Sequence, residues 1–330
     1  MLAFLTFCLV LIPISACSFY LFATAMHRAS LGQRIREYGP LLHETKSGTP
    51  TMGGLGILVL WGGCLLLTHR FHDLTMQAVF IFSAGLSFGG IGLLDDLLSL
   101  LRKRSLGLSP SQKILLTAAI SVALFLAFPQ IARVPLKVPF SLLTLSPPLG
   151  ILPFLVMGWI FVATTNSMNL TDGLDGLATG VTVLILVGYL LLFGGQELPA
   201  IILPLVGILV GFLWVNAYPA QLFLGNVGSF ALGGVVAAIA LVTGTALILP
   251  LFAGLLVLEA GSVILQVSFY RLTKRRIFKI SPFHHHFEHA EKIDYPYLLP
   301  KIEWPEPKIT LRLWILQGVF VGLGILATHL

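Results

Sequence analysis

The chain contains 330 residues, of which 56% are hydrophobic and only 10% are charged, and its mean hydropathy is +0.93. This composition excludes an ordinary soluble globular protein and a disordered chain, because the apolar residues fall in runs of about 17–25, the length that crosses the hydrocarbon core of a bilayer. The net charge of +6 suits contact with anionic lipids or with an anionic substrate, and no motif indicates nucleic-acid binding.

Taken in chain order, the apolar runs predict an all-α, polytopic membrane protein that forms a single domain over residues 1–330. Ten spans are expected, at residues 2–25, 52–68, 76–94, 114–129, 148–166, 177–194, 199–216, 229–245, 246–270 and 309–328. Between the fourth and fifth spans, residues 131–148 alternate weakly between apolar and polar side chains, which favours a short hairpin.

The distribution of lysine and arginine predicts which side of the membrane each loop faces. Alternate loops form one set, which consists of residues 26–51, 95–113, 167–176, 217–228 and 271–308. This set holds 16 of the 20 lysines and arginines, and the other set holds three. Because basic residues gather in cytoplasmic loops, we expect the first set to be cytoplasmic and both termini to face the periplasm.

An acidic pair, Asp95 and Asp96, directly follows the third predicted span. Ionisable groups at a membrane boundary are costly, and they are functional candidates for that reason. A solvated helix end is the alternative interpretation. However, aspartates at a helix C-terminus oppose the macrodipole, so we expect a compensating cation. Two adjacent carboxylates that face water also suit a divalent metal or a phosphate reaction.

The loop at 167–176 carries a second polar group. Asn166, Asn169, Asp172 and Asp175 lie at one membrane boundary with no basic residue beside them. The two aspartates would share a face if the next helix began early. Ordinary turn and cap chemistry is the alternative interpretation of this segment.

The remaining motifs suit phosphate groups. The stretch Gly225–Ser229 (GNVGS) opens a predicted helix, where free N–H groups and the dipole favour an anion, although a glycine pair alone is a weak signal. The triplet His284–His286 suits phosphate oxygens or an acidic group better than zinc, because adjacent histidines cannot all face one ion. Lys46 and Lys113 are either exposed lysines or point charges for phosphate.

All of these polar motifs fall on the predicted cytoplasmic side. This one-sidedness argues against a transporter, whose binding site should lie near the midplane of the membrane. Carboxylates for Mg²⁺, lysines and histidines for phosphates, and glycine turns for close approach together favour phosphoryl transfer. The expected substrates are a soluble nucleotide-linked donor and a lipid acceptor.

Together the motifs resemble the phospho-N-acetylmuramoyl-pentapeptide-transferase family, within the polyprenyl-phosphate N-acetylhexosamine-1-phosphate transferase superfamily. The resemblance runs nearly end to end, through KSGTPTMGG at 46–54, NLTDGLDGLATG, SVILQVSFY, HHHFE and WPEPK. It implies transfer of phospho-MurNAc-pentapeptide from UDP-MurNAc-pentapeptide to undecaprenyl phosphate, which gives lipid I and UMP for peptidoglycan synthesis. It also implies a requirement for Mg²⁺ and a location in the bacterial inner membrane, with the active site on the cytoplasmic face. A homodimer is a further possibility.

The resemblance also implies roles for individual residues. Asp95 would be the base for the lipid phosphate, with Asp96 near the metal and the diphosphate. Whether an aspartate instead attacks the donor to form a covalent intermediate stays open. Phe223 would stack on the uracil ring. The implied catalytic residues are Asp95, Asp96, Lys113 and His284; the implied substrate-binding residues are Lys46, Thr51, Asn166, Asp172, Gly173, Leu174, Asp175, Asn216, Phe223, Gln266, His285 and His286; and the implied metal ligands are Asp96 and Asn226.

The chain departs from the family pattern in two places. Asn226 stands where the family has an aspartate that binds the metal, either as an engineered substitution or as a natural variation. The loss of one negative charge predicts weaker Mg²⁺ binding and low turnover. The second departure is an insertion at 289–303, whose apolar residues predict a segment that lies on the membrane or caps the cleft, unless it is an inert surface loop.

Two alternative functions differ in ways that can be tested. A UDP-GlcNAc:polyprenyl-phosphate GlcNAc-1-phosphate transferase would share the superfamily, but the HHHFE motif at 284–288 argues against it. A membrane transporter would need polar groups that are reached from both faces, and the outer loops carry none of the motifs.

Overall fold

The structure is a computed structural model, and it describes residues 2–28, 48–70, 74–102, 107–147, 152–195, 198–289 and 295–329. Within these residues the chain is almost entirely helical, and its strands are limited to one short hairpin. The all-α fold class predicted from the sequence is therefore confirmed.

The described part of the chain forms eleven α-helices. They are α1 (Leu2–Arg28), α2 (Gly53–His69), α3 (Met76–Arg102), α4 (Pro110–Ala127), α5 (Leu152–Thr171), α6 (Leu177–Phe193), α7 (Leu198–Asn216), α8 (Gly225–Val242), α9 (Leu249–Phe252), α10 (Gly254–Thr273) and α11 (Glu306–His329). Two 3-10 turns, η2 (Ile131–Arg133) and η3 (Phe283–His286), and the strands β1 (Leu136–Lys137) and β2 (Thr144–Leu145) complete the fold. The strands pair antiparallel, which confirms the hairpin expected within 131–148.

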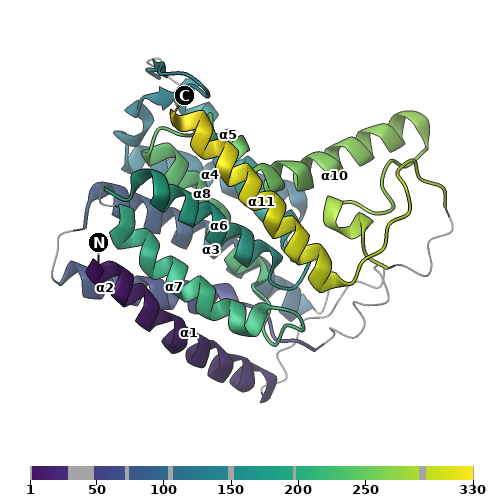
Figure 1. Cartoon of the computed structure of the whole chain (residues 1–330), viewed down its shortest axis with the longest axis horizontal. Coiled ribbons are helices and arrows are strands. Elements are labelled where there is room, and N and C mark those ends of the chain that lie inside the picture. Colours follow the sequence, from purple (N-terminus) through teal and green to yellow (C-terminus); the bar gives the residue numbers. More distant parts are fainter. Residues whose placement is uncertain are drawn as a thin grey trace.

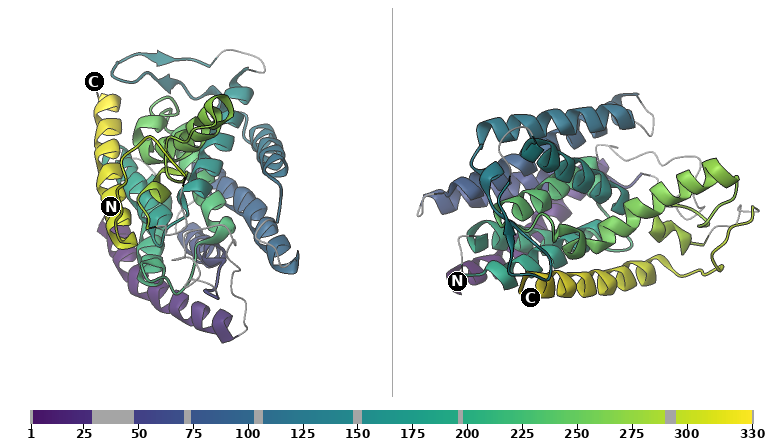
Figure 2. Two further views of the ribbon diagram at one scale, coloured as in Figure 1. Left: turned by 90° about the vertical axis from the view of Figure 1, so that its right-hand side faces the viewer. Right: turned by 90° about the horizontal axis from the view of Figure 1, so that it is seen from above.

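Helix α8 is the centre of the bundle. Every residue of α8 except Asn226 is buried, as expected for a helix that is apolar on all sides. Helices α2, α3 and α5 pack against it, while α1 pairs with α7 at one side and α11 crosses near α6 (Figure 1). Helix α10 points away from the bundle, and the segment that contains η3 returns from its end to the start of α11 (Figures 1 and 2).

The outer surface is that of a membrane protein. Seven of the described helices, namely α1, α3, α4, α7, α8, α10 and α11, are long and apolar enough to cross a membrane, and α2 and α6 are shorter apolar helices. Large apolar side chains are widely exposed, including Trp214 and Leu272, which are more than four-fifths exposed. Such exposure is unfavourable in water and favourable against lipid tails, so the bundle is a multi-pass membrane domain.

Each of the ten predicted spans overlaps a helix, but two boundaries were wrong. The third span was expected to end at residue 94, whereas α3 continues to Arg102 because Leu97–Leu101 extend its apolar pattern past the acidic pair. The ninth span, 246–270, is broken at Ala253 into α9 and α10. Pro250 at the start of α9 and Gly254 at the start of α10 are the residues that mark this break.

Helices α3 and α8 approach each other closely at Gly92. A Cβ atom on Gly92 would lie 2.0 Å from the carbonyl oxygen of Asn226, so only glycine fits at this crossing. Gly90 lies on the same helix but is exposed, and a Cβ atom there would meet nothing within 4 Å. The position of Gly92 one turn before Asp96 brings the acidic pair against the first turn of α8.

We predict that Gly92→Ala destabilises the protein by about 1–3 kcal/mol, because the added methyl group forces α3 and α8 apart. Gly90→Ala is the matched control, and it should stabilise the helix by at most about 1 kcal/mol. Thermal unfolding of both variants in the same detergent measures the difference. Equal melting temperatures for the two variants would contradict the close crossing.

Candidate active site

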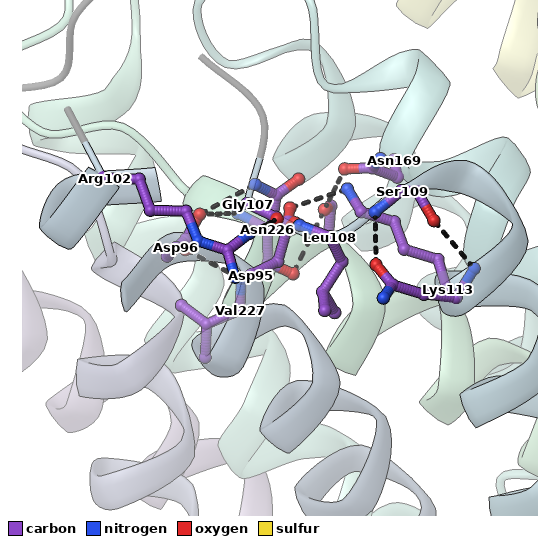
Figure 3. A network of polar contacts seen from close by, with 12 residues as sticks. Asp95, Asp96, Arg102, Gly107, Leu108, Ser109, Lys113, Asn169, Asn226 and Val227 are labelled. Carbon is purple, nitrogen blue, oxygen red and sulfur yellow. Dashed lines mark hydrogen bonds and ion pairs between the residues drawn. The ribbon is translucent and has the colours of Figure 1, made fainter. Parts of the chain in front are cut away.

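Asp95 is buried inside α3, two turns before the helix ends at Arg102. Its Oδ2 lies 2.6 Å from Nζ of Lys113, and its Oδ1 accepts a hydrogen bond of 2.6 Å from the backbone N–H of Leu108 (Figure 3). The expectation that the acidic pair stands at a helix C-terminus and opposes the macrodipole was therefore wrong, since that effect is confined to the last turn. Lys113, from α4, is the cation that compensates Asp95.

Asp96 is bound to the start of α8. Its Oδ2 accepts from the backbone N–H of Val227 at 3.1 Å, and its Oδ1 accepts from the backbone N–H and side-chain Nδ2 of Asn226 at 3.2 and 2.7 Å (Figure 3). Gly225 makes this approach possible with a positive φ of 76°. The GNVGS turn therefore binds an anion, as its sequence predicts. In this structure the anion is the carboxylate of Asp96 instead of a phosphate.

The segment between α5 and α6 carries the second acidic group. Asp175 is buried, its Oδ2 accepts from the N–H of Ala220 at 2.9 Å, and its own N–H donates to Oε1 of Glu306 at 2.8 Å. Because α6 begins only at Leu177, Asp172 and Asp175 do not share a helix face, and that expectation was wrong. Glu306, at the start of α11, was missed in the sequence, where its only signal is the acidic residue within WPEPK.

Asp172 interacts with two other acidic side chains, Asp96 and Asp175. Burial, together with the nearby charges of Asp96 and Asp175, raises the pKa of Asp172 to about 7, although His284 opposes this rise. The three carboxylates therefore repel one another, and a positive charge beside them would be stabilised.

Asn169, at the end of α5, accepts a hydrogen bond from Ser229 of α8 through its Oδ1, at 3.0 Å.

Residues 50–54 pair with the segment before α8. The N–H of Phe223 donates to the carbonyl of Pro50, and the N–H of Gly53 donates to the carbonyl of Phe223, both at 2.9 Å. Thr51 is buried between them, and its Oγ1 has no hydrogen-bond partner among the described residues. Lys46 lies outside the described residues, so the structure gives it no position.

Two predicted binding residues use their amide groups to hold the backbone. Asn216 is buried, donates to the carbonyl of Leu222 at 3.0 Å and accepts from Thr179 at 2.8 Å. Gln266, on α10, accepts from the N–H groups of Ile277 and Phe278 and donates to the carbonyl of Phe278. Each therefore shapes a loop of the site. The Nδ2 group of a third, Asn166, donates to the carbonyl of Val162 within α5.

The three histidines of η3 have separate partners. His285 contacts the carboxylate of Glu288 through Nδ1. His286 accepts from the backbone N–H of Lys279 at 3.1 Å, and burial and the charge of Lys279 lower its pKa. His284 is completely buried between Glu259 of α10 and Gly173. The triplet therefore does not form one common phosphate site in this structure.

The described part of the insertion, residues 295–303, packs against the chain that leads to η3. The N–H groups of Leu298 and Leu299 donate to the carbonyls of Arg276 and Ile277, both at 3.0 Å. The hydroxyl of Tyr295 donates to the carbonyl of Lys279 at 2.9 Å. This segment therefore braces the histidine-bearing loop. The expectation that the insertion lies on the membrane or caps the cleft stays a prediction.

The site offers oxygen donors that fit a magnesium ion with several retained waters. Among the described residues, no group of three or more His, Cys, Asp or Glu side chains is arranged to hold a metal. However, Thr51 Oγ1 and Asp96 Oδ2 both lie beside Gly225, within 2.9 Å of where its Cβ would stand, and the Thr51 oxygen has no described hydrogen-bond partner. The amide of Asn226 adjoins them. Carboxylate, hydroxyl and amide oxygens are the hard ligands that Mg²⁺ accepts.

Comparison with known proteins gives a consistent result. A model of the family described as glycosyl transferase family 4 matches residues 78–244, and a phospho-N-acetylmuramoyl-pentapeptide-transferase signature matches residues 46–58. The transferase of that name from Clostridioides difficile is 38% identical over 93% of this chain and 92% of its own length. The corresponding proteins of Clostridium acetobutylicum, at 41% over 88% and 87%, and Thermobifida fusca, at 35% over 92% of both chains, are similar in the same way.

We predict that Lys113→Met lowers the free energy of unfolding by about 3 kcal/mol, because it leaves the buried carboxylate of Asp95 without its counter-charge. The double variant Lys113→Met/Asp95→Asn should recover part of this loss. Lys308→Met, at an exposed lysine, serves as the control. Chemical or thermal unfolding of the unaltered chain, Lys113→Met, Asp95→Asn, the double variant and the control measures the coupling. A double variant that loses the full sum of the two single losses would show that the pair contributes nothing.

Proposed function

The chain belongs to the phospho-N-acetylmuramoyl-pentapeptide-transferase family, and we propose that the residues around Asp95 and Asp96 carry the reaction of that family. The enzyme transfers phospho-MurNAc-pentapeptide from UDP-MurNAc-pentapeptide to undecaprenyl phosphate and so makes lipid I for peptidoglycan. The observation that carries this conclusion is a similarity over about nine-tenths of the chain. Within the signature segment, residues 50–54 pair with residues 223–224, directly before the first turn of α8, which binds Asp96.

The reaction exchanges one phosphoanhydride bond for another. An oxygen of undecaprenyl phosphate forms a bond to the β-phosphorus of the donor, the bond from that phosphorus to the bridging oxygen breaks, and UMP leaves with the electron pair. Little covalent chemistry is required of the protein, so positioning and charge stabilisation provide most of the catalysis.

In this reaction, Lys113 and Asp95 act as a pair. Nζ of Lys113 lies 2.6 Å from Oδ2 of Asp95, so the lysine occupies the carboxylate oxygen that would accept the proton. A phosphate that enters beside α4 competes for the ammonium group of Lys113 and leaves Asp95 to take a proton from the acceptor phosphate. This exchange of partners couples arrival of the lipid phosphate to the release of the base.

Residues 173–175 and Phe223 form the proposed seat for the uridine, with Asn216 and Gln266 shaping the loops around it. Asp175 is fixed by Ala220 and by Glu306, so this segment is held in place before the nucleotide arrives. The face of Phe223 offers a flat surface for the uracil ring. His284, in contact with Gly173, and His285 are proposed for the phosphates and the sugar.

Asp96, Asn226 and Thr51 are the residues that would hold Mg²⁺, and the ion would neutralise charge on the diphosphate. Asp96 is already oriented by the first turn of α8, and Asn226 offers an amide oxygen in place of a carboxylate. We propose that the protein lies in the bacterial inner membrane with this site on the cytoplasmic face. The site residues belong to the set of alternate loops that holds 16 of the 20 lysines and arginines, and such loops are cytoplasmic. The homodimer stays a prediction.

A transfer assay with purified protein in proteoliposomes tests the function. We expect UMP release and lipid I formation with UDP-MurNAc-pentapeptide and undecaprenyl phosphate in the presence of Mg²⁺, and neither product when UDP-GlcNAc is the donor. Transfer from UDP-GlcNAc would favour the hexosamine-phosphate alternative. Movement of undecaprenyl phosphate or of ions across the vesicles without nucleotide would favour a transporter.

We predict that Asn226→Asp increases turnover by about 10-fold or more and raises the affinity for Mg²⁺, because a carboxylate binds this ion more tightly than an amide does. UMP release measured across a Mg²⁺ titration gives both quantities. Asn169→Asp is the matched control, since it adds the same charge one helix away and should give no gain. Equal turnover of Asn226→Asp and the unaltered chain at every Mg²⁺ concentration would refute the prediction.

A further inference from the structure

Glu259 is a carboxylate in the middle of the apolar helix α10, and its side chain is completely buried. A charge in such a place is costly unless a partner compensates it. Oε2 of Glu259 lies 3.0 Å from Nδ1 of His284 and 3.3 Å from the backbone N–H of the same residue. Its Oε1 has no hydrogen-bond partner among the described residues. The carboxylate is therefore directed at a single residue, which is a proposed catalytic group.

The opposite edge of His284 faces the proposed donor site. Its Nε2 is buried and has no hydrogen-bond partner among the described residues. A Cβ atom on Gly173 would lie 2.2 Å from this nitrogen, so the ring fits only because residue 173 is glycine. One edge of the imidazole is thus held by α10, and the other is presented to the segment 172–175.

The charges around His284 favour its protonated form. Burial by itself lowers the pKa of the imidazole, but the carboxylate of Glu259, with smaller effects from Glu288 and Glu306, outweighs burial and raises the pKa. Asp172 also interacts with the charge of His284, which partly opposes the rise in the pKa of that carboxyl. With Nδ1 against a carboxylate, the proton on Nε2 becomes the one available for an anion.

We propose that Glu259 is a positioning residue that fixes the ring orientation and the Nδ1 proton of His284, so that Nε2–H is offered to the diphosphate of the nucleotide donor. The proposal rests on the proposed function and adds a residue that acts only through His284. It also links α10, which points away from the bundle, to the chemistry (Figure 1).

Kinetics of Glu259→Gln provide the first test. This substitution keeps the shape and removes the charge, and we expect kcat to fall by about 10- to 100-fold, with a smaller change in KM for the donor. The alkaline limb of the pH profile of kcat should move to lower pH, because His284 then loses its proton more easily. Glu259→Asp keeps the charge and should leave the limb closer to its original position.

Two controls separate positioning from packing. Gln317 of α11 is also fully buried, and it bonds the backbone of Phe252 and Leu255 near the start of α10. Gln317→Leu should therefore lower the melting temperature without moving the pH profile. In a double-mutant cycle, Glu259→Gln/His284→Gln should be no less active than His284→Gln alone. The proposal would be overturned if the double variant lost activity by the product of the losses in Glu259→Gln and His284→Gln. It would also be overturned if Glu259→Gln kept the original pH profile.

A measurement without substrate tests the role of Glu259 independently of whether the protein has the proposed transferase activity. In protein labelled at the histidine ring nitrogens, the NMR signals of His284 are identified because they are absent from His284→Gln. Their positions are then followed as a function of pH. Glu259→Gln should move that titration to lower pH, and an unmoved titration would overturn the inference. A wild-type chain that made no lipid I, but in which this shift occurred, would count against the proposed function alone.

Discussion

The bond between the carboxylate of Asp96 and the first turn of α8 is the interaction on which the site depends. A carboxylate among apolar helices is stable only where donors replace its water, and the N–H groups of Asn226 and Val227 do so. The close crossing at Gly92 brings α3 near enough to the start of α8 for this bond to form. Because α8 is the buried centre of the bundle, Asp96 is attached to the helix that the other helices surround.

Around this bond, segments distant in sequence are joined mainly through backbone groups. Residues 50–54 are held to 223–224, and the segment 172–175 is held to Ala220 and to the first residue of α11. The loop that carries the histidines is held by Gln266 and by residues 295–303. Side chains that would otherwise be free for a substrate thus provide the frame, and relatively few groups are left for chemistry. Lys113 belongs to both groups, since it neutralises Asp95 and, in the proposed reaction, would exchange that carboxylate for a phosphate.

Hydropathy located the helices well and their ends less well. An apolar run of about 20 residues admits only a helix in a bilayer, so a helix could be predicted within each of the ten runs. The end of α3 was missed because two charges interrupt the hydropathy while the helix continues beneath them to Arg102. The types of residue at the site could also be predicted, but their partners could not. The pairing of Asp175 with Ala220, or of Glu259 with His284, depends on how distant segments fold together, and no local pattern records it.

The amide of Asn226 has a consequence for how this centre behaves when no divalent ion is present. Its Nδ2 group donates to Asp96 at 2.7 Å, so a fixed dipole occupies the place where a second carboxylate would repel the first. The amide therefore partly takes the role of a counter-ion for Asp96. We expect the start of α8 to keep its position when divalent ions are removed, whereas two facing carboxylates would repel each other under the same conditions.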